Sequence, residues 1–201
     1  MTSTSTARDR AKAERTDALL EAAARLFAER GYSGVSLEDI GAAVGVSGPA
    51  VYRHFPGKQA LLGAVLTQVS ADLVAGGTRV AEEATDAPHR MRALIGFHVE
   101  FALGKADVIR VQDRDLAHLS DADRAEVRRL QRTYIDLWID ALSDLREGGS
   151  EDQRLRVQAC FGLINSTPHS TRSSARAQAE TARVLSAMAL SALLADSTVD
   201  Q

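Results

Sequence analysis

Residues 36–58, which read SLEDIGAAVGVSGPAVYRHFPGK, constrain the fold more than any other segment. Ser36 begins a helix, because its hydroxyl can accept a bond from a free backbone amide, and Asp39 occupies the capping-box position. Gly45 can supply the positive φ that ends this helix, and Ser47 is expected to cap a second, short one. Two helices joined by a tight turn containing glycine are typical of a helix-turn-helix, whose second helix enters the DNA major groove.

Composition favours a soluble, helical chain. Its 201 residues are 45% hydrophobic and 25% charged, with four prolines, and Ala, Leu, Arg, Glu and Asp fill most of the sequence. We find no strand-period segment, no apolar run suited to spanning a bilayer and no signal peptide, and therefore expect an all-α, cytoplasmic protein. The single cysteine, Cys160, argues against an internal disulfide framework or a Cys-based zinc site.

The net charge of −3 is unusual for a nucleic-acid-binding protein. Residues 1–58 carry eight Lys and Arg against seven Asp and Glu, and the remainder carries sixteen against twenty. The asymmetry has the sign that DNA binding requires but is small. Affinity for DNA must therefore come from where the charges lie rather than from bulk charge.

Helical periodicity and chain breakers suggest three parts. Residues 1–14 read as a flexible basic arm, 15–57 as a helix-turn-helix domain and 58–201 as a larger helical domain that begins with a connecting helix over 58–79. Gly76-Gly77 is expected to interrupt or bend the end of that connecting helix. Further helices are expected near 88–104, 106–118, 121–146, 151–166 and 173–195.

Several short motifs together resemble the tetracycline-repressor (TetR) family over residues 15–65. They are Gly31-Tyr32, Ser36, Gly45-Val46-Ser47 and the run Val51-Tyr52-Arg53-His54-Phe55-Pro56-Gly57-Lys58-Gln59-Ala60-Leu61-Leu62. The resemblance implies a three-helix DNA-binding domain, a connecting fourth helix, a helical ligand domain and a homodimer. It also implies phosphate contacts from Ser36, Tyr52 and Lys58. The residues that it places on the exposed side of the recognition helix are Ser47, Gly48, Ala50, Arg53 and His54.

The spacing of the short helix agrees with this assignment. Val51 and Phe55 are four residues apart and are expected to be buried, which leaves Arg53 facing outward as the best candidate to read a guanine edge. Gly48 and Ala50 are too small to read bases by hydrogen bonds and could instead permit close approach to the groove or contact a thymine methyl group. Each residue also has an ordinary reading: the serines as helix caps, Tyr52 as a packing residue and His54 as a surface histidine.

The N-terminal arm allows two interpretations. Arg8, Arg10, Lys12 and Arg15 could reach into a minor groove, as homeodomain arms do. The residues before Arg8 are better explained as a solubilising tail.

Five of the nine aromatic residues lie in the C-terminal two thirds, where they indicate an effector pocket. Tyr134 and Trp138 share one side of a predicted helix, and His98 shares a side of its helix with apolar neighbours. Aromatic rings with polar tips turned inward are typical of an apolar pocket with a few polar anchors, although an ordinary core with satisfied tips gives the same pattern. The candidate pocket residues are Phe97, His98, Phe101, Tyr134, Trp138 and Phe161.

A stripe of basic residues, Arg110, Arg114 and His118, occupies one helix face at i, i+4 and i+8. It could bind the carboxylate, phosphate or coenzyme A portion of an anionic ligand, and a solvated face offset by Asp113 and Asp115 is the alternative. Asp115 and His118 alone are too few ligands to predict a metal site.

The last two predicted helices, 151–166 and 173–195, are expected to form the dimer interface. The second has a face rich in small residues, comprising Ala175, Ala179, Ala182, Leu185, Ala189 and Ala192. Packed against their symmetry mates, the two helices would form a four-helix bundle.

The sequence therefore favours a transcriptional repressor that a small lipophilic ligand releases from a palindromic operator on double-stranded DNA. The aromatic set suggests the lipophilic part, and the basic stripe suggests an anionic end such as that of an acyl-CoA. The alternative is a constitutive or architectural DNA-binding protein that acts through a protein partner without an effector. We find no nucleophile–base pair, phosphate-binding glycine loop or metal cluster, and so expect no enzyme activity, catalytic residue or cofactor.

Overall fold

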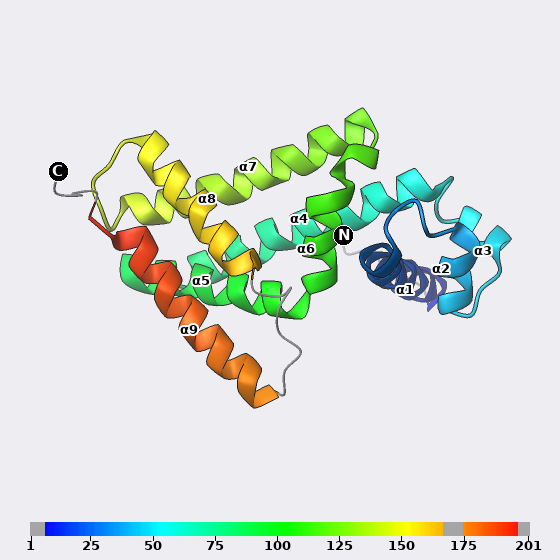
Figure 1. The fold of residues 1–201 in the computed structure, drawn as a ribbon, viewed down its shortest axis with the longest axis horizontal. Coiled ribbons are helices and arrows are strands. Elements are labelled where there is room, and N and C mark those ends of the chain that lie inside the picture. Colours follow the sequence, from blue (N-terminus) through cyan, green and yellow to red (C-terminus); the bar gives the residue numbers. More distant parts are fainter. Residues whose placement is uncertain (1–6, 167–174, 197–201) are drawn as a thin grey trace. The chain divides into compact units, whose positions relative to one another are not determined.

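The computed structural model describes residues 7–166 and 175–196, and all regular structure within them is helical (Figure 1), which confirms the expected all-α class. In chain order the elements are α1 (Ala7–Arg30), α2 (Leu37–Ala43), α3 (Gly48–Tyr52), α4 (Lys58–Glu82), α5 (Ala87–Gly104), α6 (Ala106–Asp115), the 3₁₀ turn η1 (Leu116–His118), α7 (Asp121–Ser143), α8 (Ser150–Ser166) and α9 (Ala175–Leu194).

These helices form two compact units. The first comprises the residues up to Val69 together with Asp107–Val127, and the second comprises Ser70–Ala106 with the residues from Arg128 onward. Both α4 and α7 contribute to each unit. In this grouping α6 and η1 lie with the N-terminal helices, and the sequence-based division at residue 58 stays a prediction.

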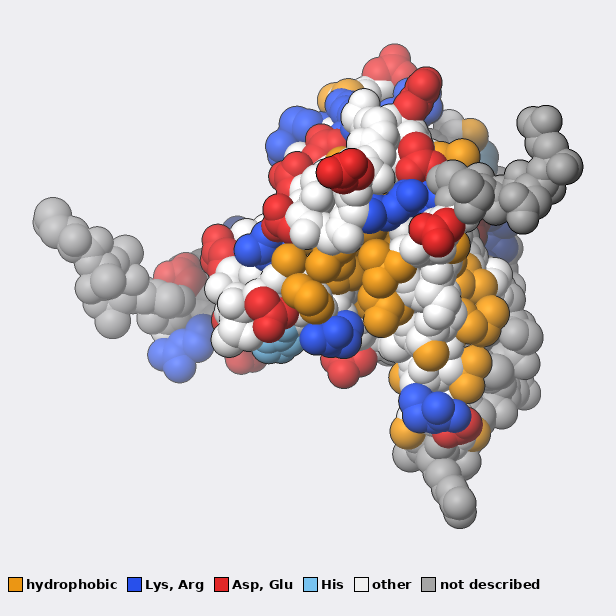
Figure 2. Space-filling view, turned by 90° about the vertical axis from the view of Figure 1, so that its left-hand side faces the viewer, with side chains coloured by type: hydrophobic (Ala, Val, Ile, Leu, Met, Phe, Trp, Pro, Cys, Tyr) orange, Lys and Arg blue, Asp and Glu red, His pale blue; other side chains and the backbone are white. Residues whose placement is uncertain are grey.

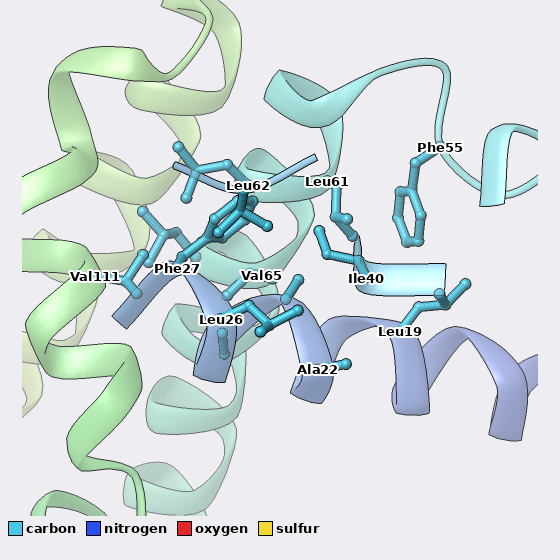
Figure 3. Close-up of a cluster of buried hydrophobic side chains, with 14 of the residues drawn as sticks. Leu19, Ala22, Leu26, Phe27, Ile40, Phe55, Leu61, Leu62, Val65 and Val111 are labelled. Carbon is cyan, nitrogen blue, oxygen red and sulfur yellow. The ribbon is translucent and has the colours of Figure 1, made fainter. Parts of the chain in front are cut away.

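Apolar side chains from α1, α2, α3, α4, α6 and α7 form the core of the first unit (Figure 3). The three-and-four spacing along α1 turns Leu19, Leu26 and Phe27 to one side, where each is at most 4% exposed. Side chains from the other helices complete the core, namely Ile40 from α2, Leu61, Leu62 and Val65 from α4, and Val111 from α6. Burial of each large apolar side chain contributes about 1.5–3 kcal/mol, so this core fixes the elements that carry the helix-turn-helix.

Helix α1 begins earlier than expected. It starts at Ala7, so residues 7–14 of the predicted flexible arm are helical. The physical reason is local, because this stretch lacks Gly and Pro and is rich in Ala, Arg, Lys and Glu, which favour helix. Residues 1–6 lie outside the described part of the chain.

The glycine pair in α4 does not break the helix, contrary to the expectation from the sequence. Helix α4 continues through Gly76 and Gly77 to Glu82. A Cβ atom at Gly76 would collide with the Phe97 ring, and one at Gly77 would lie 2.6 Å from Tyr134 Cε2. The two glycines are therefore sites of close helix packing and do not interrupt the helix.

Of the described helices, α4 alone is long and apolar enough to cross a membrane by length and composition, although we expected no such run. The buried face of α4 explains its apolar composition. Leu61, Leu62 and Leu66 are fully buried within the first unit, and the glycine pair packs in the second. We therefore assign α4 to the core of the fold.

Candidate nucleic-acid interface and effector site

The start of α2 has the predicted capping box. The Ser36 hydroxyl accepts a 3.0 Å hydrogen bond from the Asp39 amide, and the Asp39 carboxylate accepts bonds from the Ser36 amide (2.9 Å) and hydroxyl (2.7 Å). These bonds lower the pKa of Asp39. Ser36 thus orders the start of α2, and its predicted contact with DNA phosphate stays a prediction.

The turn between α2 and α3 depends on two glycines. Gly45 has a φ of 73°, as the sequence predicts, and the next amide, that of Val46, donates to the Gly41 carbonyl at 2.9 Å. A Cβ at Gly41 would lie 2.8 Å from the Val46 carbonyl oxygen and 3.0 Å from Val51 Cγ2. The absence of a side chain at Gly41 therefore lets α3 pack directly against α2.

The predicted recognition helix, α3, is short and contains about one and a half helical turns. Ser47 stands at its N-cap, but the hydroxyl makes no capping bond, in contrast to the expectation. Regular helix ends at Tyr52, and Arg53 is already the C-cap. Val51 and Phe55 are buried as predicted, at 0% and 8% exposure, and anchor α3 to the core.

The outward side of α3 offers two long exposed side chains. Tyr52 is 53% exposed and Arg53 is exposed, whereas Ala50 is half-buried. His54 is half-buried and its Nδ1 lies 3.1 Å from the Thr16 hydroxyl of α1. Tyr52 and Arg53 are thus accessible candidate DNA contacts, as is Ser47 at the N-cap, which is also exposed.

Gly48, at the start of α3, faces a side chain of α2. A Cβ at this position would meet Glu38 Cγ at 3.2 Å and Oε1 at 3.3 Å. Its small size therefore accommodates the flexible Glu38 side chain. Close approach to a DNA groove, suggested by the sequence, stays a prediction.

Lys58, at the start of α4, has an internal role that the sequence did not reveal. Its ammonium group donates 2.8 Å hydrogen bonds to the carbonyls of Tyr32 and Val35 and lies 4.4 Å from the centroid of the Tyr32 ring. Two of its three N–H donors thus hold the segment that connects α1 to α2. The predicted contact between Lys58 and DNA phosphate, which the third N–H donor could make, stays a prediction.

The basic stripe on α6 and η1 makes contacts within the first unit. Arg114 donates to the carboxylate of Asp115 and to the Phe27 carbonyl, and its bonds with Asp115 raise its pKa. Arg110 lies 3.6 Å from Asp107. The His118 ring stacks on Tyr32 with centroids 4.5 Å apart. The sequence named Asp115 as an offset for a solvated face, but it did not predict the contacts of Arg114 with Phe27 and of His118 with Tyr32, which join elements distant in the chain.

The candidate pocket aromatics come together in the second unit. The rings of His98, Tyr134, Trp138 and Phe161 have centroid separations between 4.5 Å and 6.1 Å. We refer to these four rings as the aromatic cluster. Phe101 lies 6.2 Å from His98, and Phe97 packs over Gly76. All six aromatic candidates therefore belong to this unit, whereas the basic stripe belongs to the other.

Burial determines the protonation of the cluster. His98 is 3% exposed, and its burial lowers its pKa to about 4. Burial also raises the pKa of Tyr134, whose hydroxyl lies 3.4 Å from His98 Nδ1. Both side chains are therefore uncharged at neutral pH.

Two neighbours of the cluster on α8 were not among the sequence candidates. The Asn165 side chain lies next to His98 and raises its pKa, against the larger effect of burial. Cys160 is 1% exposed, and burial raises the pKa of its thiol to about 12. An amide and a thiol in an ordinary amphipathic helix carry no local signal, so only their spatial proximity to the rings identifies them.

The fold and these motifs match known proteins. The family model described as "Bacterial regulatory proteins, tetR family" matches residues 19–65, and the one described as "Tetracyclin repressor-like, C-terminal domain" matches residues 84–192.

Of two curated relatives, one is a transcriptional activator and the other a transcriptional repressor. The chain is 30% identical to the HTH-type transcriptional activator FasR of Mycolicibacterium smegmatis, covering 79% of this chain and 71% of that protein. It is 25% identical to the HTH-type transcriptional repressor KstR2 of Rhodococcus jostii, covering 78% of this chain and 77% of that protein. A solved TetR-family transcriptional regulator from Bordetella parapertussis superposes with a TM-score of 0.77 at 25% identity, covering 87% of this chain and 93% of that chain.

Proposed function

The chain belongs to the TetR family of DNA-binding transcriptional regulators, and on this basis we propose that it is a dimeric repressor released from a palindromic operator by a lipophilic effector. Members of this family are regulators and not enzymes. A repressor of this kind works in the cytoplasm, where it meets operator DNA. The curated relatives include both an activator and a repressor, so the sign of regulation is part of the proposal.

The observation that carries the DNA-binding part is the two-sided character of α3. Val51, and Phe55 just after the helix, are buried in the core, whereas Tyr52 and the C-cap residue Arg53 are exposed. In this arrangement Arg53 would read a guanine O6/N7 edge and Tyr52 would contact phosphate. The remaining assigned contacts, from Ser36, Ser47, Gly48, Ala50, His54 and Lys58, are parts of the same proposal.

The proposed dimer interface lies on α8 and α9. Helix α9 packs against α5 and α8, and Leu185, Ala189 and Leu193 are buried within the chain. The small-residue face expected from the sequence is thus partly used internally.

The exposed side of these helices is also apolar. Large hydrophobic side chains that remain exposed are Leu155 (66%), Met188 (49%), Val184 (41%) and Leu194 (40%). On the side where Figure 1 draws these helices, hydrophobic side chains gather into a band between charged ones (Figure 2). A symmetric copy packed there would form a four-helix interface, and two recognition helices one DNA turn apart, about 34 Å, fit a palindrome.

Control by an effector is proposed from the aromatic cluster. A ligand that binds the non-operator-binding conformation more tightly would shift the population away from DNA. The alternative, constitutive binding without an effector, predicts a closed core with satisfied polar tips. The gathering of four aromatic rings with polar tips in the second unit is what supports an effector.

The test is binding of the purified protein to the DNA upstream of its own coding region, at stated salt, with and without a panel of acyl-CoAs. We expect sequence-specific binding that one compound releases. Specific binding that no compound disturbs would support the constitutive alternative. Equal binding to scrambled DNA would overturn the operator proposal, and the Arg53→Ala variant provides a matched protein that should lose the preference for the upstream sequence.

A further inference from the structure

The hydroxyl of Thr16 on α1 makes two polar contacts. It donates a 3.0 Å hydrogen bond to the carbonyl of Lys12, one turn earlier on the same helix. Its oxygen also lies 3.1 Å from Nδ1 of His54, which follows the C-cap of α3. Both residues belong to the first unit. The pair therefore joins α1 to the end of the candidate recognition helix.

The bond to Lys12 uses the single hydrogen of this hydroxyl. A threonine in a helix can donate to the carbonyl four residues before it. Thr133 on α7 and Thr181 on α9 do the same, at 3.2 Å and 2.8 Å. A hydroxyl has one hydrogen and two lone pairs. With its hydrogen donated to Lys12, the oxygen of Thr16 can only accept.

The tautomer of His54 follows from this geometry. Because the Thr16 oxygen accepts, Nδ1 of His54 is the N–H donor of the pair. A neutral imidazole with its hydrogen on Nδ1 has a bare lone pair on Nε2, which is then a hydrogen-bond acceptor. Within the described part of the chain, Nε2 of His54 makes no hydrogen bond and is not among the buried polar atoms.

The core holds both partners of this hydrogen bond in place. The His54 amide donates to the carbonyl of Val51 at 2.9 Å, and Val51 is fully buried. The next residue, Phe55, is 8% exposed, and its ring centroid lies 6.4 Å from that of His54. On α1, Leu19 is fully buried three residues after Thr16. The accessible Nε2 is therefore presented from a fixed position.

Few groups of DNA can pair with such an acceptor. In the major groove the hydrogen-bond donors are the N6 amino group of adenine and the N4 amino group of cytosine. Guanine O6 and N7, thymine O4 and the phosphate oxygens are acceptors and offer Nε2 no hydrogen. His54 in this tautomer thus complements Arg53, whose N–H donors suit a guanine.

We propose that Thr16 is a positioning residue for operator recognition, because it holds His54 as the Nδ1–H tautomer and so directs Nε2 to accept from an adenine or cytosine amino group. This inference rests on the proposed function and adds the class of base that His54 reads. Without the Thr16 hydroxyl the ring is free to take the other tautomer, in which Nε2 donates and suits guanine or phosphate. Base preference should therefore depend on Thr16.

The tautomer is measured on the free protein. The full chain, labelled with ¹⁵N at histidine, is studied by two-dimensional ¹⁵N NMR at pH 8.5, where an ordinary imidazole is neutral. His54→Gln identifies the signals of His54 among those of the five histidines. We expect the hydrogen on Nδ1 in the unaltered chain and in Thr16→Ser. A hydrogen predominantly on Nε2 in the unaltered chain would overturn the proposal.

Base analogues test the contact with DNA. Within the upstream segment that the protein protects, each adenine in turn is replaced by purine, which lacks the N6 amino group, and each cytosine by 2-pyrimidinone, which lacks the N4 amino group. We expect one replacement in each half-site to weaken binding by the unaltered chain about fivefold more than binding by His54→Ala, as the loss of one hydrogen bond does. The comparison with His54→Ala cancels the effect of the analogue on the duplex. Equal losses for both proteins at every position would overturn the contact.

Threonine variants separate control of the tautomer from simple packing. Thr16→Val keeps the shape of the side chain but loses the hydroxyl, so it should no longer discriminate against that analogue, whereas Thr16→Ser should still do so. Thr133→Val is the matched control, because it removes the same kind of bond from an exposed threonine of α7. Thr16→Ala gives the same test should Thr16→Val not fold, as judged by circular dichroism. Full discrimination by either folded variant would refute the role of Thr16.

Failure of this inference can be told from failure of the proposed function. If the upstream DNA binds specifically but His54→Ala weakens every sequence alike and lowers the salt dependence, the regulator stands and His54 contacts phosphate instead. If the chain shows no sequence-specific DNA binding, the proposed function fails, whatever tautomer the NMR spectrum reveals.

Discussion

The ammonium group of Lys58 lies over the ring of Tyr32 and donates a hydrogen bond to the carbonyl of the same residue. A second bond to the Val35 carbonyl makes Lys58 a brace for the segment between α1 and α2. Because the donor is charged and the contact is partly buried, these bonds should matter for stability as well as for any contact with DNA.

Lys58→Met should therefore destabilise the protein by about 2 kcal/mol, since bonds to charged groups are worth about 1.5–3 kcal/mol each and part of the loss is recovered by hydration of the carbonyls. Urea unfolding measures this change. An unaltered unfolding midpoint together with weaker operator binding would instead assign the ammonium group to DNA phosphate.

Arg53→Ala should leave stability unchanged, because Arg53 is exposed, and should relax sequence preference by about 1–3 kcal/mol. Arg53→Lys keeps the charge but loses the bidentate fork, so it should retain affinity for random DNA better than the alanine variant. Competition between operator and scrambled DNA at fixed salt distinguishes the two. Equal preference in all three proteins would remove Arg53 from base reading.

The glycines of α4 and α5 should respond oppositely to alanine. Gly77→Ala places a Cβ 2.6 Å from Tyr134 Cε2 and should destabilise the protein by about 1–3 kcal/mol. At Gly96, also helical, a Cβ meets nothing within 4 Å, so Gly96→Ala should stabilise by up to about 1 kcal/mol. Thermal unfolding of both variants checks the pair, and stabilisation by Gly77→Ala would contradict the close packing described above.

Stability should fall as the pH decreases from about 6.5 towards 4 because of His98. Its pKa is about 4 in the folded chain and 6.5 for the ordinary side chain, so within this window the unfolded state binds a proton that the folded state does not. The resulting loss between pH 7 and pH 5 is about 2 kcal/mol. His98→Phe should lack this component. Identical pH profiles for both proteins, from urea unfolding, would show that His98 does not titrate in this way.

Charge on the exposed apolar side of α8 and α9 should dissociate the proposed dimer. Leu155→Glu combined with Met188→Glu would bury two like charges next to their symmetry copies, which costs several kcal/mol. Thr133→Glu, at an exposed position of α7, is the control. Light scattering at micromolar concentration should give a monomer for the double variant and a dimer for the control. A monomer for the unaltered chain would reject the interface.

Local chemistry predicted the helix-turn-helix well. The capping box of Ser36 and Asp39, the positive φ of Gly45 and the burial of Val51 depend on neighbouring residues and on helical spacing. Such features can be inferred from a single sequence because the interacting groups are only a few residues apart.

Contacts between distant residues could not be predicted in the same way. Gly76 and Gly77 looked like helix breakers because their packing partners, Phe97 and Tyr134, lie on other helices. Arg114 looked available to a ligand, but it bonds to the carbonyl of Phe27, 87 residues away. For the aromatic cluster the sequence identified the rings, and only the fold revealed which of them pack against one another.

The buried Cys160 makes the opening of α8 measurable. Thiol reagents react with the thiolate, which burial strongly disfavours here, so modification must await an excursion that brings the sulfur to solvent. Since Cys160 is the single cysteine, the rate of thiol labelling measures how often this one site opens to solvent. The neighbouring residue is Phe161 of the aromatic cluster, and an occupied cluster should therefore slow the reaction without any change in the average structure.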